Sequence, residues 1–189
     1  LGKERFDWLK SNISGGDSSS TYNTFINSYN NNWITDSDHY LAGSNSAQWT
    51  YNWTNGDSYI LSKMTAFLLQ LGTDNLAQAR CEFIIEKYIT YIDGINFDNY
   101  SGDTQENLLR ENCEFGAILL DWTYDYIPVT QRQNLSVSFY RVPEYFMNNY
   151  ILTGSGNSYV TSHNINNCIM TMRAAIALHG ADGLSSSQS

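Results

Sequence analysis

The residues best suited to chemistry lie at the start of the last helical stretch, SHNINNCIMTMRAAIALHG. His163 follows a Gly/Ser/Asn loop and opens this stretch, where backbone N–H groups and the helix dipole favour a bound carboxylate and disfavour a protonated imidazole. Asn164 and Asn167 follow, and Asn167 lies four residues after His163, so both side chains can face one cleft. His163 is therefore a candidate base or carboxylate partner, and the amides are candidate carboxylate donors. Helix capping and plain solvation are the competing interpretations.

Aromatic residues gather in a second region, residues 36–55, which shows no sustained hydrophobic period and is expected to be a long loop. Tyr, Trp and His side chains on such a loop suit a platform for sugar rings. A loop held against the helices by its aromatic side chains would have the same composition. The expected substrate-binding residues are His39, Tyr40, Trp49, Trp53, Asn166 and Arg110.

Other signatures of chemistry are missing from the sequence. It contains no GxGxxG, no GxxxxGK[ST], no HExxH and no GxSxG, so no cofactor is expected within it. The cysteines Cys81, Cys113 and Cys168 show no CxxC spacing, and free, buried thiols are expected for the two that fall on apolar helix faces.

Composition and charge narrow the classes of partner. Of 189 residues only 15% are charged, 14 are Tyr, and the net charge is -9. This balance excludes a nucleic-acid partner, which requires a basic patch. It also opposes an anionic polymer unless Arg, Lys or His gather locally. No apolar run is long enough to span a bilayer. A surface rich in neutral polar and aromatic residues suits sugars, but some secreted proteins are rich in Asn, Ser and Tyr without binding sugars. Either way, an extracytoplasmic location is expected, with any signal peptide already removed.

Hydrophobic spacing predicts helices throughout. A first helix ends at Gly15-Gly16, a second carries Tyr22 to Trp33, and a third covers residues 56–72. Asp74 is expected to cap the next helix, and Asp103 or Thr104 to cap a helix over residues 104–127. Pro143 is expected to start or kink a later one. The last helix, residues 163–179, carries an apolar set: Ile165, Ile169, Met172, Ala175, Ile176 and Ala177.

These elements predict an all-α chain of antiparallel helix pairs. The rhythm of helix, short turn, helix and long loop is typical of an (α/α)-toroid or solenoid, and a compact bundle is the competing arrangement. We expect residues 1–189 to form one helical domain, part of an incomplete toroid. The tail GLSSSQS suggests a fragment from the N-terminal part of a larger chain.

Two motifs resemble a known family. Leu71-Gly72-Thr73-Asp74 stands at a helix joint like that of uronic-acid lyase toroids, and EFGAILLDWTYDYIPVTQR is similar to a helix end of heparinase II/III-like polysaccharide lyases, with Arg132 after the turn. The segments ERFDWLKSNI and SHNINNCIMTMRAAIALHG extend the similarity over most of the chain. Leu120 departs from the family pattern, as does Ser162-His163-Asn164 where members have Asn-Asn-His-Gly.

The resemblance implies a lyase that cleaves an acidic, uronic-acid-containing polysaccharide by β-elimination. Asn or His would neutralise the uronate carboxylate, and His or Tyr would act as base and acid, the acid Tyr lying beyond these residues. A β-sandwich domain would follow in the same protein, and any structural divalent metal would lie elsewhere in it. A toroid glycoside hydrolase remains an alternative, with its two carboxylates drawn from Asp36, Asp38, Asp103, Glu106 and Glu111. A non-catalytic glycan-binding protein of a surface uptake system is the third.

Overall fold

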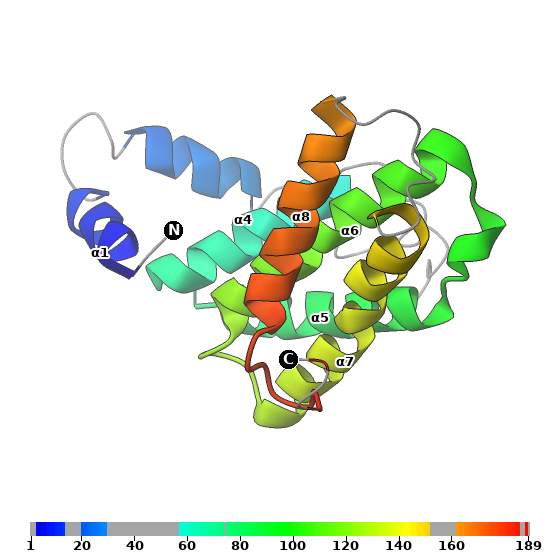
Figure 1. Cartoon of the computed structure of the whole chain (residues 1–189). Coiled ribbons are helices and arrows are strands. Elements are labelled where there is room, and N and C mark those ends of the chain that lie inside the picture. Colours follow the sequence, from blue (N-terminus) through cyan, green and yellow to red (C-terminus); the bar gives the residue numbers. More distant parts are fainter. Residues whose placement is uncertain are drawn as a thin grey trace, which may run out of the picture. The chain divides into compact units, whose positions relative to one another are not determined.

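The computed structural model describes residues 3–13, 20–29, 57–73, 75–151, 162–185 and 188. Every regular element in these ranges is a helix (Figure 1), which confirms the expected all-α class for the described part of the chain. None of these helices is both long enough and apolar enough to cross a membrane. The chain divides into two compact units, Leu1–Ala77 and Gln78–Ser189. The single domain expected over 1–189 and its toroid arrangement stay predictions.

The first unit contains α1 (Lys3–Asn12), a helix over residues 20–29, and α4 (Asp57–Leu71). Phe6 of α1 packs on Phe67 of α4, with ring centroids 5.7 Å apart. Tyr29 is fully buried and its hydroxyl donates to Thr65 Oγ1 at 2.9 Å, which joins the second helix to α4. Gly72 ends α4 with φ of +65°, a conformation that glycine adopts without strain.

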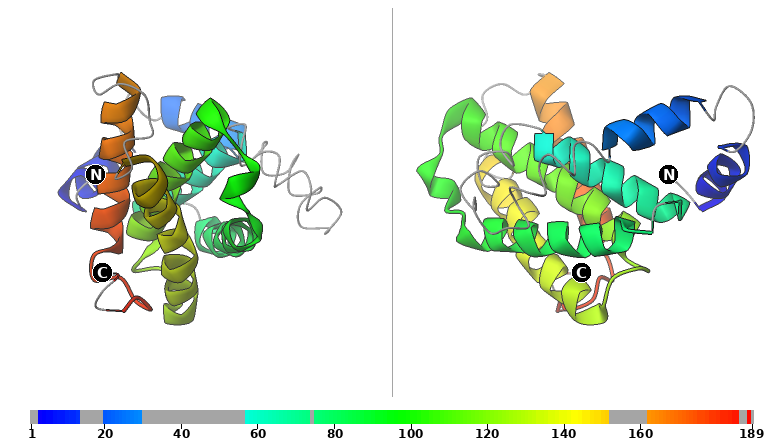
Figure 2. Two further views of the ribbon diagram at one scale, coloured as in Figure 1. Left: turned by 45° about the vertical axis from the view of Figure 1, so that its right-hand side comes forward. Right: turned by 180° about the vertical axis from the view of Figure 1, so that it is seen from behind.

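The second unit contains α5 (Ala77–Gly94), the 3₁₀ turn η1 (Phe97–Asn99), α6 (Gly102–Thr123), α7 (Val129–Phe146), the π-helical segment η2 (Met147–Ile151) and α8 (Ser162–Leu178). Figures 1 and 2 show α7 and α8 against the central α6. On another side of α6, the ring of Phe115 meets Tyr88 of α5 edge to face, with centroids 4.9 Å apart. The Tyr88 hydroxyl also donates to the carbonyl of Asn112 at 3.2 Å.

The predicted apolar side of α6 forms the core of this unit, since Leu108, Leu109, Cys113, Leu119 and Leu120 are all buried. Buried thiols that form no disulfide are confirmed at Cys81 and Cys113, whereas Cys168 is exposed. Burial in apolar surroundings raises the pKa of the Cys113 thiol, which keeps it protonated and inert.

Two predicted helix boundaries were wrong. The helix expected from Asp103 or Thr104 begins at Gly102, and its N-cap, Ser101, makes no side-chain capping bond. Gly102, the first residue of this helix, adopts φ of +56°, a conformation open to glycine, so the helix begins before Asp103 and Thr104. The same helix ends at Thr123 rather than at residue 127, because residues 124–127 form the turn before Pro128, the N-cap of α7.

Pro143 lies inside α7 and does not start a new helix. It has no N–H to donate to the carbonyl one turn earlier, so α7 lacks one helical hydrogen bond there. The winding then changes to π at Met147 and continues so to Ile151. A helix start at Pro143 was therefore a wrong prediction, and a kink there stays a prediction.

The last helix packs through the side opposite to its large apolar residues. Four residues on one side of α8 are buried: Asn167, Thr171, Ala174 and Leu178. Among the other helices, α8 contacts α6 most extensively. Ile165, Ile169, Met172 and Ile176 are exposed. The apolar residues that the sequence assigns to this helix are thus mostly on its outer surface.

Candidate functional site

The predicted catalytic residues share the first part of α8. The helix begins at Ser162, so the backbones of His163 and Asn164 lie in its first turn as expected, and only their backbones belong to the described structure. Asn167 is 5% exposed. Among the predicted substrate-binding residues, Asn166 is exposed, and Arg110 donates to Asn107 Oδ1 at 2.6 Å on α6. His39, Tyr40, Trp49 and Trp53 lie outside the described residues.

The side chain of Asn167 crosses from α8 to α6. Its Nδ2 donates to Oε1 of Glu106 at 2.7 Å. Its Oδ1 is buried and accepts no hydrogen bond from any described residue. A buried amide oxygen without a donor costs free energy of the order of 1–3 kcal/mol, so this position suits a donor supplied by water or by a ligand.

A chain of hydrogen bonds begins at Gln105, the residue before Glu106. Gln105 Oε1 accepts a short hydrogen bond from the hydroxyl of Tyr150. Its Nε2 donates to the hydroxyl of Tyr145 at 2.9 Å and to the carbonyl of Phe97 at 2.6 Å. The Tyr145 hydroxyl in turn donates to Asp98 Oδ1 at 2.6 Å. We call Asp98, Gln105, Glu106, Tyr145, Tyr150 and Asn167 the polar cluster.

Irregular segments bring these side chains together. In η1, Asn96 Oδ1 accepts from the N–H of Asp98 at 3.0 Å, which fixes the turn that carries the Asp98 carboxylate. Phe97 packs on Tyr145 with ring centroids 5.0 Å apart. Tyr150 lies on the π-helical η2, a kind of segment that is frequent at functional sites.

Electrostatics keep both phenols of the cluster protonated. Burial raises the pKa of Tyr145 to about 12, helped by its hydrogen bond to Asp98. Burial also raises the pKa of Tyr150, and the negative charge of Glu106 adds to this shift. At neutral pH Tyr150 is therefore a proton donor next to a carboxylate, and not a base.

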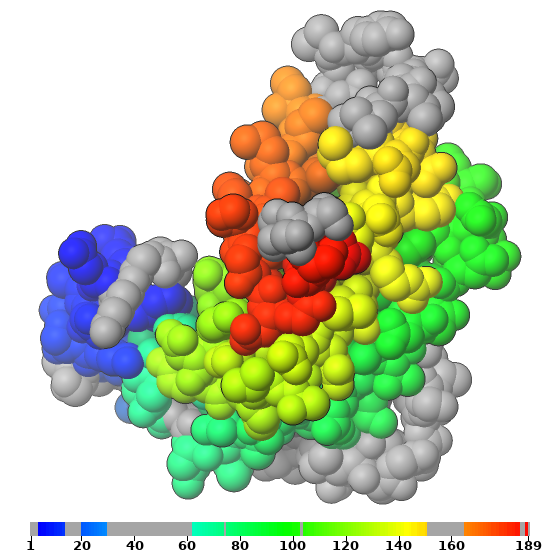
Figure 3. Space-filling model, turned by 60° about the horizontal axis from the view of Figure 1, so that its bottom comes forward, coloured from blue at the N-terminus to red at the C-terminus, as the bar shows by residue number. Residues whose placement is uncertain are grey.

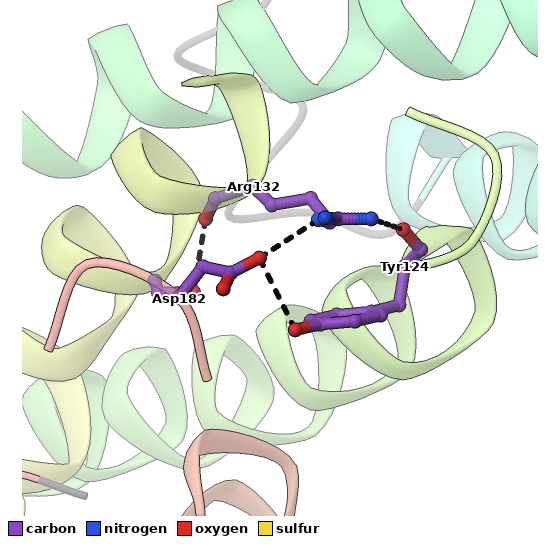
Figure 4. Close-up of polar contacts among 4 residues, drawn as sticks. Tyr124, Arg132 and Asp182 are labelled. Carbon is purple, nitrogen blue, oxygen red and sulfur yellow. Dashed lines mark hydrogen bonds and ion pairs between the residues drawn. The ribbon is translucent and has the colours of Figure 1, made fainter. Parts of the chain in front are cut away.

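Tyr124 and Arg132, from the motif that resembles the lyase family, form a set of contacts with Asp182 (Figure 4). Arg132 Nε lies 3.0 Å from Asp182 Oδ2, and its Nη1 donates to the carbonyl of Tyr124 at 2.7 Å. The Tyr124 hydroxyl donates to the same Asp182 oxygen at 3.2 Å, and the guanidinium stacks 4.4 Å from the centre of the Tyr124 ring. These three residues join the α6–α7 turn to the segment after α8.

Sequence reasoning missed most of the polar cluster. Glu106 was a candidate only for the hydrolase alternative, and Asp98, Gln105, Tyr145 and Tyr150 were not candidates at all. The available signal was the sequence INFDNYSGDTQEN, where amides and acids surround the buried Phe97. No period connects that segment with Tyr145 and Tyr150, which follow some forty residues later in the chain.

Comparisons of the chain with known protein families, curated proteins and solved structures find no match. The resemblance of its motifs to heparinase II/III-like lyases therefore stays a prediction. Within the described ranges, no group of three or more His, Cys, Asp or Glu side chains is arranged to hold a metal ion.

Proposed function

We propose that this chain is the helical part of a polysaccharide lyase, an extracytoplasmic enzyme that acts on a uronic-acid polymer at the polar cluster. The observation that supports it is the buried amide of Asn167, whose oxygen accepts from no described residue and is open to a sugar hydroxyl. The same amide is bonded to Glu106, a carboxylate whose charge acts on the protonated Tyr150. The helix pairs would belong to an (α/α)-toroid, followed in the whole protein by a β-sandwich domain. A structural divalent metal, if the enzyme uses one, would lie elsewhere in that protein.

The cluster suits β-elimination in the following way. A base takes the C5 proton of the uronate, the C–H electrons form a C4=C5 double bond, and the C4–O bond breaks. We assign the base to His163 and the neutralisation of the uronate carboxylate to Asn164 and Asn167. Tyr150 would protonate the leaving oxygen, in place of an acid from another part of the protein. The Asn167 amide must then exchange Glu106 for the substrate carboxylate.

Glu106 favours a second candidate, a glycoside hydrolase. Its negative charge next to Asn167 repels a uronate carboxylate, whereas a neutral sugar meets no such repulsion. Hydrolases of this kind use two carboxylates, one as acid and one as base or nucleophile. Asp98 and Glu106 supply two carboxylates to the polar cluster, one bonded to Tyr145 and one to Asn167.

The experiment that tests the proposal is an ultraviolet assay for unsaturated uronate ends. The full chain is incubated with alginate, hyaluronan, chondroitin, heparan and plant or algal uronans, beside His163→Ala. A rise in absorbance that His163→Ala abolishes supports the lyase. Reducing ends without a rise in absorbance, lost in Glu106→Gln, would favour the hydrolase instead. Binding of a polymer without any cleavage would favour the non-catalytic glycan-binding protein.

A further inference from the structure

The polar cluster carries negative charge next to the proposed acid. Glu106 accepts from Asn167 at 2.7 Å, and its charge contributes to the raised pKa of Tyr150. Asp98 is a second carboxylate, bonded to Tyr145. Figure 3 shows η2 and the end of α7, in yellow, between the start of α8, in orange, and the green segment that leads into α6. A sugar that reaches Tyr150 therefore approaches a carboxylate.

Little positive charge on the neighbouring helices offsets these carboxylates. Arg110 follows Glu106 by one turn of α6 and donates to Asn107 Oδ1 at 2.6 Å. Its single charge offsets at most one of the two carboxylates. The arginines of α7 and α8 contact other groups: Arg132 contacts Asp182, Arg141 the carbonyl of Ile92, and Arg173 the sulfur of Met170. The cluster thus keeps an excess of negative charge, which repels an anionic sugar.

Asn167 is better placed to bind a hydroxyl than a carboxylate. Its Nδ2 donates to Glu106, and because the amide is 5% exposed, it holds that carboxylate in the cluster. Its Oδ1 is buried and accepts no hydrogen bond from a described residue. An amide oxygen requires a donor, which a sugar hydroxyl supplies and an ionised carboxylate does not.

We propose that the polar cluster takes uronate units whose carboxyl group is esterified, and that Glu106 makes this selection. This inference rests on the proposed lyase function and names its class of substrate. An ester is neutral, so the charge of Glu106 does not repel it. Asn167 can then keep its bond to Glu106 while Oδ1 accepts from a hydroxyl of the sugar.

An ester also suits β-elimination at a site with little positive charge. The base assigned to His163 takes the C5 proton, and the C–H electron pair forms the C4=C5 double bond. The ester carbonyl carries the single negative charge that develops, whereas an ionised carboxylate would have to carry two. The C4–O bond breaks, its electron pair stays on the leaving oxygen, and Tyr150 gives that oxygen a proton. The ester bond stays intact, and water carries a proton from His163 back to Tyr150.

Paired polymers test the proposal: methyl-esterified polygalacturonan, alginate and hyaluronan, each compared with the same preparation after saponification. Binding is measured by titration calorimetry at low salt and neutral pH, with the full chain carrying His163→Ala so that no polymer is cleaved. In at least one pair the ester should bind at least about tenfold more tightly than the free acid. Double-bond formation is measured separately with the wild type, beside a blank without protein.

Two further variants assign the preference to Glu106. Glu106→Gln, made in the same background, should bring the ratio of the two affinities to within about twofold. Gln keeps an oxygen that accepts from Asn167, so the fold should survive, which circular dichroism checks. Glu86→Gln, at an exposed position of α5, changes the net charge of the chain equally and should leave the ratio unchanged.

The two measurements separate this inference from the proposed function. A free acid bound as tightly as its ester, a ratio unchanged in Glu106→Gln, or no binding of any ester would overturn the inference. Double bonds formed at least as fast in the free acids as in the esters would support the lyase and overturn the inference. Preferential binding of an ester that Glu106→Gln removes, without double bonds in any polymer, would support selection by Glu106 and overturn the lyase.

Discussion

Asn167 and Glu106 are joined across the α6–α8 interface by a hydrogen bond of 2.7 Å, in which a 5% exposed amide holds a carboxylate. The pair lies on the buried side of α8, where its neighbours along the helix are Thr171 and Ala174. It connects the helix that carries His163 to the helix that carries Gln105 and Glu106. The geometry of the polar cluster should therefore depend on this contact.

Asn167→Asp places a second carboxylate against Glu106 in a buried position. Like charges raise the pKa of one carboxyl group of the pair above its unfolded value near 4. Stability associated with that proton is present below the unfolded pKa and is lost as pH rises through the folded pKa. The variant should lose about 2–4 kcal/mol in free energy of unfolding at pH 7 and recover much of it at pH near 4. Urea unfolding at both pH values measures this, with exposed Asn166→Asp as control; equal losses in both variants would contradict it.

Tyr145 makes stability depend on alkaline pH. Its pKa is raised from 10.0 to about 12 in the folded protein. A raised pKa means that its contribution is complete below pH 10 and is lost as pH rises from about 10 to about 12. As the pH rises through this range, the free energy of unfolding of the wild type should therefore fall faster than that of Tyr145→Phe. The difference in stability between the two proteins should become smaller. Unfolding titrations at successive pH values test this, with Tyr126→Phe as control; parallel curves for wild type and Tyr145→Phe would count against it.

Gly116 of α6 packs directly against the ring of Phe139 of α7. A Cβ at this position would overlap the ring of Phe139, which is fully buried and cannot move aside freely. Gly116→Ala should destabilise the protein by about 1–3 kcal/mol, because overpacking outweighs the gain of about 1 kcal/mol in helix propensity. Gly94→Ala is the matched control, since a Cβ there meets no atom within 4 Å. Thermal unfolding of both variants measures the difference, and equal midpoints would refute the close contact.

Asp182 should contribute more to stability than an exposed ion pair does. It accepts from both Arg132 and Tyr124, and the side chains of Arg132 and Asp182 are only 17% and 32% exposed. Asp182→Asn should cost about 1–3 kcal/mol. Asp93, 3.6 Å from Arg141, is 54% exposed, so Asp93→Asn should cost less than about 1 kcal/mol. Urea unfolding compares the two, and amide exchange should rise in residues 179–185 only for Asp182→Asn.

The helices were predictable where the spacing of apolar residues and the position of a glycine indicate the same helix end. Gly72 ends α4, and the apolar face of α6 is the core, as its pattern indicates. Periodicity failed for α8, because buried polar residues can satisfy themselves within their own helix. Thr171 Oγ1 donates to the carbonyl of Asn167 at 2.8 Å, so burial of Thr171 requires no partner on another helix. A hydrophobic pattern assigns such polar residues to the outer face of a helix. For the same reason it does not predict the burial of Asn112, whose side chain donates to the carbonyl of Leu108 on α6.

The candidate site was less predictable than the fold. Four of its six residues come from the start of α6, a 3₁₀ turn and a π-helical segment, none of which has a simple sequence period. His163, Asn164 and Asn167 could be chosen because they stand together in the sequence. Tyr150 could not, because only the folding of α7 and η2 against α6 brings its hydroxyl to Gln105.

The most direct test of the central claim is the initial rate of double-bond formation, measured by ultraviolet absorbance, in wild type, Tyr150→Phe and the control Tyr126→Phe, on the polymer cleaved fastest. If Tyr150 protonates the leaving oxygen, Tyr150→Phe should lower the rate by at least about a hundredfold, while Tyr126→Phe stays close to wild type. A rate that is unchanged in Tyr150→Phe, or polymer cleavage that produces reducing ends without a double bond, would contradict a lyase site at the polar cluster.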